Sequence, residues 1–161
     1  MARPIRIKPH HFVDIITSFG KGQRRFEPHP YGHAVHSVTA AVAADPDVML
    51  QMEFGADDIC APCTHCIDGV CDDTIDTSYR PKAPSLKREW NLLLDRRWSA
   101  ALGLREGQHL TARTFCELLR DGPRDLTNIY REIRADMTAE RAAGLRKGVT
   151  AFLAGEVHLE A

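Results

Sequence analysis

Four of the five cysteines in this 161-residue chain lie close together, and this cluster limits most strongly how the chain can fold. Cys60, Cys63, Cys66 and Cys71 form a C-x2-C-x2-C-x4-C pattern. The segment around them, residues 57–84, has few large apolar side chains and contains three prolines, so it cannot build a hydrophobic core of its own. Metal ligation by the thiolates would supply the missing folding free energy. The sequence therefore predicts a loop that is held together by a metal centre.

The spacing favours an iron–sulfur cluster over other centres. Bacterial ferredoxins use C-x2-C-x2-C followed after three residues by Cys-Pro, and this loop reproduces the first three positions, with its fourth cysteine one residue later and no proline. Structural zinc more often takes two C-x2-C pairs that are a dozen or more residues apart, although four thiolates in a flexible loop can also form a tetrahedral zinc site. We expect all four cysteines as ligands of a 2Fe–2S or 4Fe–4S cluster, with zinc as the alternative.

A metal-free redox dithiol is a third interpretation, because Cys60-Ala-Pro-Cys63 is a C-x-x-C sequence that follows a predicted strand. A thioredoxin-like site needs a helix to begin there, so that the helix N-terminus lowers the pKa of the first thiol. Residues 64–77 contain Gly69 and do not have a helical pattern. This interpretation would also leave Cys66 and Cys71 without a role.

Several polar residues are candidates for the surroundings of the centre. His10 and His11 begin a predicted helix, and Asp14 lies on the same face as His10. A histidine beside a carboxylate can bind a metal or titrate near neutral pH, and it can also be an ordinary structural contact at a helix start. His65, inside the loop, could replace a thiolate or face outward. We expect His10, His11, Asp14, Asp58 and His65 to surround the metal ligands.

The charge of the chain is unevenly distributed although its net value is only −1. The near-neutral total gives no basic field, so nucleic acid is not an expected partner. Residues 53–79 contain no Lys or Arg and seven acids: Glu53, Asp57, Asp58, Asp68, Asp72, Asp73 and Asp76. These acids can be solvated surface charge, and they can at the same time lower the reduction potential of a cluster or form a docking face for a basic redox partner.

No uncharged stretch is apolar enough for a membrane span, and no secretory signal follows Met1. Cysteines in a chain without an export signal are not expected to form a disulfide framework. We therefore expect a cytoplasmic protein without a membrane partner.

The predicted fold class is mainly α, or α+β at most: a helical domain with one or two short strands and a metal-stapled cysteine-rich loop. Apolar spacing predicts helices over residues 10–19, 31–44, 85–103, 111–120, 123–135 and 138–154, and a strand over 48–54. Ser85 is the expected N-cap of the helix over 85–103, and Cys116 is expected to be a buried packing residue. We predict a single domain over 1–161, with a metal-binding part over 1–80, whose cysteine loop is 57–84, and a helical part over 85–161.

Three short sequences resemble one protein family. They are Lys8-Pro9-His10-His11-Phe12-Val13, then Phe19-Gly20-Lys21-Gly22, then Asp57-Asp58-Ile59-Cys60 with the cysteines after it. In this order, over residues 5–75, they look like the bacterial and archaeal DUF1284 family of uncharacterised proteins, often described as iron–sulfur binding. The resemblance implies a cluster-binding loop and no known reaction. Family members commonly carry a cysteine where Asp14 stands, so the resemblance leaves open whether Asp14 or Cys71 completes the ligand set.

The first hypothesis is thus a small iron–sulfur protein that transfers electrons or senses redox state or cluster supply. The second is a zinc-stapled scaffold or interaction protein without redox activity. A third is an enzyme that uses the centre together with His10, His11 and Asp14.

Overall fold

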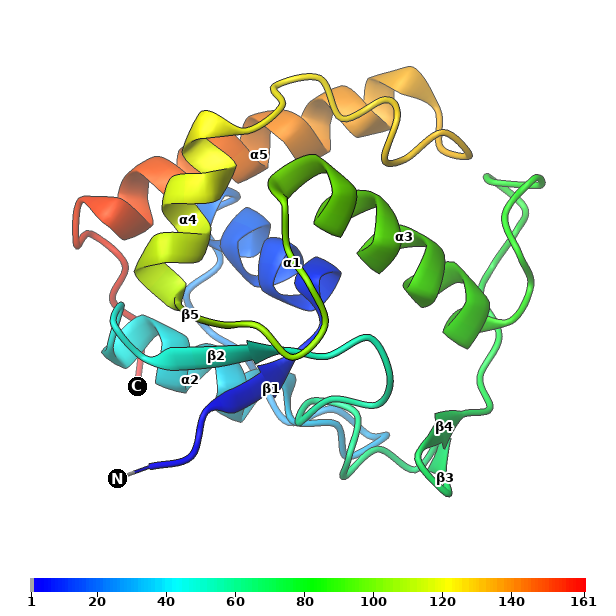
Figure 1. Ribbon diagram of the computed structural model, residues 1–161, viewed down its shortest axis with the longest axis horizontal. Helices are drawn as coiled ribbons and strands as arrows, with labels where there is room; N and C mark the ends of the chain where they lie inside the picture. The colour runs from blue at the N-terminus through cyan, green and yellow to red at the C-terminus, as the bar shows by residue number, and fades with distance from the viewer. Residues whose placement is uncertain (1) are drawn as a thin grey trace.

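The computed structural model of the chain describes residues 2–161 (Figure 1). Helix α1 (Pro9–Gly20) runs through its middle, and the other elements are arranged around it. Pro9 occupies the first turn, where its missing N–H costs no hydrogen bond. Apolar side chains on most sides of α1 are buried, among them Phe12, Ile16 and Phe19. A helix that is apolar on most sides has to be covered on most sides, which explains its central place.

Four further helices are described in residues 2–161: α2 (Val35–Ala44), α3 (Lys87–Leu102), α4 (Ala112–Asp121) and α5 (Ala135–Leu153). None of the helices in this range is long and apolar enough to cross a membrane. The fold class is α+β with helices predominating, as the sequence predicted.

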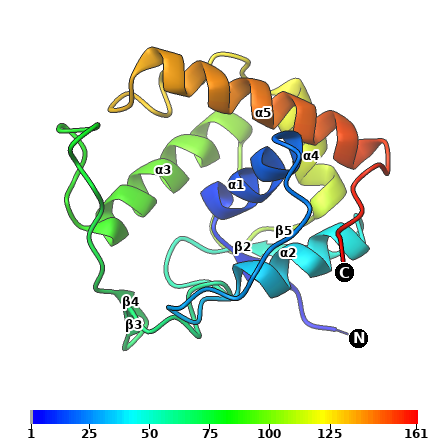
Figure 2. The same cartoon turned by 180° about the vertical axis from the view of Figure 1, so that it is seen from behind.

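A small sheet covers one side of the core. Strands β1 (Ile5–Ile7), β2 (Met49–Met52) and β5 (His109–Thr111) lie in the order β1-β2-β5. β1 and β2 are parallel, with Ile5 opposite Leu50, whereas β2 and β5 are antiparallel. A separate hairpin, β3 (Cys66–Ile67) and β4 (Val70–Cys71), lies at the end of the molecule away from both termini (Figure 2).

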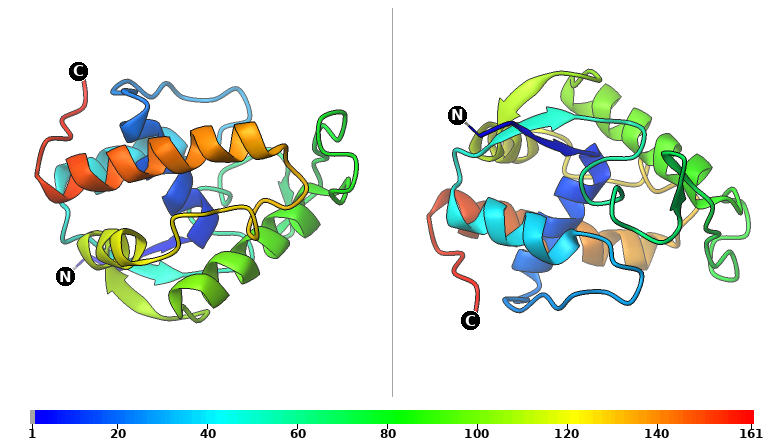
Figure 3. Two further views of the ribbon diagram at one scale, coloured as in Figure 1. Left: turned by 90° about the horizontal axis from the view of Figure 1, so that it is seen from above. Right: turned by 90° about the horizontal axis from the view of Figure 1, so that it is seen from below.

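Glycines allow α5 to lie directly against α1, as the left view of Figure 3 shows. A Cβ on Gly148 would lie 1.9 Å from the carbonyl oxygen of Ile16, and one on Gly20 would lie 1.7 Å from that of Gly144. Both distances are far below van der Waals contact, so only glycine fits at these two positions. The crossing of α1 and α5 therefore depends on the absence of two side chains.

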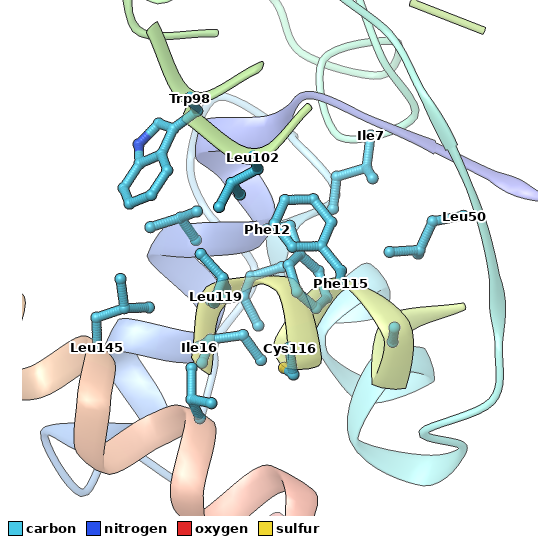
Figure 4. Packing of buried hydrophobic residues seen from close by; sticks show 14 of the residues in the cluster. Ile7, Phe12, Ile16, Leu50, Trp98, Leu102, Phe115, Cys116, Leu119 and Leu145 are labelled. Carbon is cyan, nitrogen blue, oxygen red and sulfur yellow. The ribbon is translucent and has the colours of Figure 1, made fainter. Parts of the chain in front are cut away.

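The core between α1, α3, α4 and α5 is packed with aromatic and aliphatic side chains (Figure 4). The rings of Phe12 and Phe115 lie 4.3 Å apart between their centroids. Cys116 is fully buried beside them, and burial raises the pKa of its thiol. The prediction that Cys116 is a packing residue is confirmed.

Because Cys116 only fills space, Cys116→Ala is expected to cost about 1 kcal/mol of unfolding free energy, at the mild end of core truncations. Urea denaturation of the two proteins measures this cost. The metal content should be unchanged. Loss of metal from this variant would contradict the purely structural role of Cys116.

The helix predicted over residues 123–135 is wrong. The chain makes successive turns there, with Ile129 N–H donating to the carbonyl of Leu126 and Ile133 N–H to that of Tyr130. The Asp125 side chain accepts a hydrogen bond from Thr127 N–H at 2.9 Å, which competes with helical bonding. Leu126, Ile129 and Tyr130 are still buried, so the apolar pattern reflects core contacts made from turns.

Other elements differ from expectation in their bounds. α2 begins only at Val35, because Gly32 adopts a positive φ of 76° that interrupts the helix. α3 follows Leu86, so Ser85 is not its N-cap. The predicted strand over 48–54 is shortened to β2, and the short strands β3, β4 and β5 were not predicted.

Candidate metal centre

The sheet topology brings the histidines and the cysteine loop to one place. Lys8, His10 and His11 directly follow β1, and the segment that leads to Cys60 follows β2. Because β1 and β2 are parallel, the chains that leave their carboxyl ends start at the same edge of the sheet. Asp58 N–H donates to the carbonyl of Arg6, which fastens the two segments side by side.

Asp57 connects the two segments most firmly. Its carboxylate is fully buried and accepts hydrogen bonds from His11 Nδ1 and Lys8 N–H, both at 2.7 Å. It also accepts bonds from the N–H groups of Ile59 at 3.1 Å and Cys60 at 3.0 Å. Burial alone would raise the pKa of Asp57, but His11, the Lys8 backbone and the Lys8 charge outweigh burial and hold it well below its usual range. Asp57 therefore fixes where the cysteine loop begins.

Cys60, the first cysteine, lies against a buried ammonium group. Lys8 is only 4% exposed, and its Nζ lies 3.4 Å from Cys60 Sγ. Burial and the nearby Asp57 charge raise the pKa of Cys60 to about 11, although Lys8 opposes the shift. The free side chain is thus a thiol, and a metal that binds it has to displace a proton.

His10 and His11 are each oriented by a fully buried carboxylate. Asp95, on α3, accepts hydrogen bonds from His10 Nδ1 at 2.7 Å and from His10 N–H at 2.9 Å. Asp57 holds His11 Nδ1 in the same way. With Nδ1–H donating to the carboxylate, Nε2 of each ring stays available, and this is how carboxylates orient metal-binding histidines.

The pKa values of the two histidines are shifted in opposite directions. Burial lowers the pKa of His10, but Asp95 outweighs this effect and the net shift is upward. For His11 burial is the larger effect, so its pKa is lowered although Asp57 opposes the shift. His11 is therefore the better metal ligand of the two, because a metal binds the neutral imidazole.

All four loop cysteines line one cavity of about 320 Å³. Its walls also include His10, His11 and Asp14 from α1, Tyr31 and His33 from the loop before α2, and Trp90 and Leu94 from α3. Tyr130 and Arg141 close the side next to α5. The cavity thus joins thiols, imidazoles and a helix-lined apolar wall in one space.

Of the other three residues expected around the metal ligands, two line the cavity and one does not. Asp14 lines the cavity and accepts a hydrogen bond from Arg141 Nη1 at 3.0 Å. His65 also lines it, with its Nδ1 2.7 Å from Asp72 Oδ1. Asp58 instead accepts bonds from Arg6 N–H and from Arg3 at the start of the chain, and it is not among the residues that line the cavity.

Within residues 2–161, one group of three metal-ligating side chains has ligand atoms all within 4.8 Å of one another: His11, Asp57 and Cys60. This group is compatible with metal binding. However, the four N–H donors on Asp57 occupy both of its oxygens, which leaves little capacity for a cation. Asp57 is therefore better described as the residue that positions His11 and Cys60 than as a ligand.

Sequence reasoning missed Asp95 and Lys8. Asp95 stands in the buried stripe of α3 beside Leu94 and Trp98, and a carboxylate in such a stripe is the signal that could have revealed it. Lys8 carried no comparable signal, because its contact with Cys60 depends on how the two segments pair after the strands.

The site and fold together define an α+β protein with a cysteine-lined cavity that is compatible with metal binding. Comparison with protein-family models, curated proteins and solved structures gave no match to this chain. The function is therefore argued from the site itself.

Proposed function

We propose that this chain binds an iron–sulfur cluster through Cys60, Cys63, Cys66 and Cys71 and uses it for electron transfer or for sensing redox state or cluster supply. The observation that carries the proposal is that all four loop cysteines line a single cavity. Membership of the DUF1284 family, which remains a prediction, would imply the same kind of centre.

The arrangement of the thiols supports a cluster more than a single zinc ion. Thiolates that share one zinc at ~2.3 Å stand roughly 3.8 Å apart in a tetrahedron. In residues 2–161 the one group of three metal-ligating side chains whose ligand atoms lie within 4.8 Å of one another contains a single loop sulfur, that of Cys60. Cluster thiolates are divided among two or four iron atoms, with at most two of them on one iron, so the four need not lie so close together. Cys63 N–H donates to the Cys60 carbonyl and Cys66 N–H donates to the Cys63 carbonyl, so the backbone makes two successive tight turns. Such turns are what thiolates three residues apart need in order to converge on one centre.

Zinc remains the second candidate, because the group of His11, Asp57 and Cys60 contains the ligand types that a divalent cation uses. A zinc-bound chain would act as a scaffold or interaction protein without redox activity. Its purified form would be colourless, whereas a cluster absorbs visible light.

The ligand assignment is tested by Cys71→Ser and Asp14→Ala, prepared anaerobically and compared by visible absorption and iron content. Loss of a thiolate ligand should abolish or convert the cluster. Loss of a neighbouring carboxylate should weaken metal binding by ~10- to 100-fold at most. Cys116→Ala is the matched control for a cysteine outside the site. If Asp14→Ala empties the site and Cys71→Ser leaves it filled, the assignment is wrong.

Lys8 should tune the cluster through Cys60. Lys8→Met removes a buried positive charge and the N–H donor that lies 3.4 Å from Cys60 Sγ. Both changes favour the oxidised, less negative cluster, so the reduction potential should fall. A redox titration followed by electron paramagnetic resonance measures the shift. Lys82→Met makes the same charge change at an exposed position and should leave the potential nearly unchanged; equal shifts in both variants would contradict a direct effect of Lys8.

The surface beside the cluster fits a basic redox partner. At the tip of the β3–β4 hairpin, Ile67 and Val70 are 53% and 47% exposed, and acidic residues surround them in the sequence. An apolar centre with an acidic rim complements a partner with a basic rim. Electron transfer to a basic haem protein, used as a probe, should slow as ionic strength rises, and Asp68→Asn/Asp72→Asn should weaken that dependence. A rate that salt does not change would overturn this partner assignment.

A further inference from the structure

We propose that Cys66 and Cys71 form an intramolecular disulfide when no metal holds them, so that the cysteine loop has a second, covalently closed state. The inference concerns the cysteine pair itself and does not depend on which metal the loop binds.

The hairpin register places the two cysteines opposite each other. Cys66 on β3 pairs with Cys71 on β4, next to the pair Ile67 and Val70. The connecting residues Asp68 and Gly69 have φ values of 51° and 77°, which is the two-residue turn that closes tight hairpins. Residues directly opposite in such a ladder point to the same face. Both cysteines accordingly line the same cavity.

The hydrogen bonds show which type of pair this is. Asp72 N–H donates to the carbonyl of His65 at 2.8 Å, so the next pair outward is hydrogen-bonded. Pairs alternate along an antiparallel ladder, which makes Cys66 and Cys71 a non-hydrogen-bonded pair, the type whose Cα atoms are only about 4.5 Å apart. That separation lies within the range of about 4.4 to 6.8 Å that disulfides span.

The environment also permits the reaction. Neither cysteine is fully buried, so a small oxidant can reach them, whereas Cys116 is enclosed in the core. Cys60 is fixed at the junction with α1, because Lys8 contacts its sulfur and Asp57 accepts a hydrogen bond from its backbone N–H. The pair at the hairpin is therefore the one that can close without moving the junction with α1.

The oxidant that we assign is a low-molecular-weight disulfide such as oxidised glutathione. One cysteine thiolate of the pair attacks it, forming a mixed disulfide and releasing one glutathione thiolate, which takes up the proton that the cysteine lost. The second cysteine then attacks the protein sulfur of the mixed disulfide and expels the second glutathione thiol. The two cysteines lose two electrons and two protons in total, and the oxidant gains them. In the product the sulfurs of Cys66 and Cys71 are bonded to each other and are no longer thiolates, so the loop cannot bind the metal as its reduced form does.

The experiment uses the full-length chain, both as isolated and after a chelator has removed metal, with metal content measured on every sample. Each sample is treated with oxidised glutathione, its free thiols are alkylated, and the chain is cut before aspartate residues. Such cleavage yields peptide 58–67, with three cysteines, and peptide 68–71, with Cys71 alone. In samples without metal we expect the two peptides to be linked through Cys66, with the chain lighter by two hydrogens, whereas chains that hold metal should keep both cysteines reduced. In samples without metal, alkylated or glutathione-bound Cys71, or a link from Cys71 to Cys60 or Cys63, would overturn the proposal.

Two double variants provide a matched comparison that does not need the metal. Cys60→Ser/Cys63→Ser keeps the proposed pair, and Cys60→Ser/Cys71→Ser keeps Cys63 and Cys66 instead. Because the hairpin pre-orients its pair, the first variant should close at least about tenfold faster than the second. Equal rates in two variants with the same circular dichroism would contradict the inference. If the purified chain contains no metal but still forms the Cys66–Cys71 disulfide, the proposed function is overturned and the disulfide inference stands.

Discussion

Gly148→Ala is expected to lose about 3 kcal/mol of unfolding free energy, a large part of the ~5–15 kcal/mol that holds a single domain folded. The added Cβ would lie 1.9 Å from the carbonyl oxygen of Ile16 on α1. That obstacle is backbone and cannot rotate away as a side chain can. Helix α5 would have to move off α1, and the apolar contacts between the two helices would open along their length.

Gly144→Ala is the matched control on the same helix. Its Cβ would meet only side-chain atoms of Lys21 and Thr17, at 3.2 and 3.3 Å, and these can shift by a few tenths of an ångström. The gain in helix propensity, about 1 kcal/mol, offsets most of this cost. Guanidinium denaturation of both variants measures the difference. Equal stability of the two variants would mean that α1 and α5 do not cross as described.

Asp57→Asn is expected to cost roughly 3 kcal/mol, because it breaks a fully buried charge interaction and leaves hydrogen-bond donors facing an amide N–H₂ group. The donors are the N–H groups of Lys8, Ile59 and Cys60 and the Nδ1–H of His11. The loss should loosen the cysteine loop and lower the metal content as well. Asp58→Asn, one residue away, removes a partly exposed carboxylate and should cost much less.

The contribution of Asp57 to the free energy of unfolding should also depend on pH. Its folded-state pKa is depressed, so its contribution to stability is fully present above the unfolded pKa of about 4 and is lost as pH falls through the folded pKa. The stability gap between the natural chain and Asp57→Asn should therefore shrink as the solution is acidified below about pH 4. A gap that is constant with pH would show that the carboxylate is not the charged anchor of the loop.

Local patterns in the sequence were enough to predict several elements. Helix α1 follows from Pro9 at its first turn, its apolar residues and Gly20 at its end. The spacing of the cysteines was enough to single out the loop that lines the cavity. These signals lie within one element or one loop, so they do not depend on how distant parts of the chain pack.

Contacts between distant segments could not be predicted. The pairing of His10 with Asp95 joins α1 to α3, and the contact of Lys8 with Cys60 depends on β1 and β2 lying parallel. Strand β5 is only three residues long and is defined by its partner β2 rather than by its own pattern. The segment over 123–135 has helical spacing of apolar residues, but the Asp125 side chain favours a turn instead.

The central claim is that the four cysteines of the loop hold an iron–sulfur cluster. It is tested most directly by measuring iron, acid-labile sulfide and zinc in the chain purified without oxygen from cells grown with iron. The proposed function predicts iron and sulfide in equal amounts per chain and a visible absorption band that reductant bleaches. Cys71→Ser should lose the cluster or convert it, which changes the iron content and the band, whereas Cys116→Ala should change neither. Stoichiometric zinc without sulfide, or a chain that binds no metal, would contradict it.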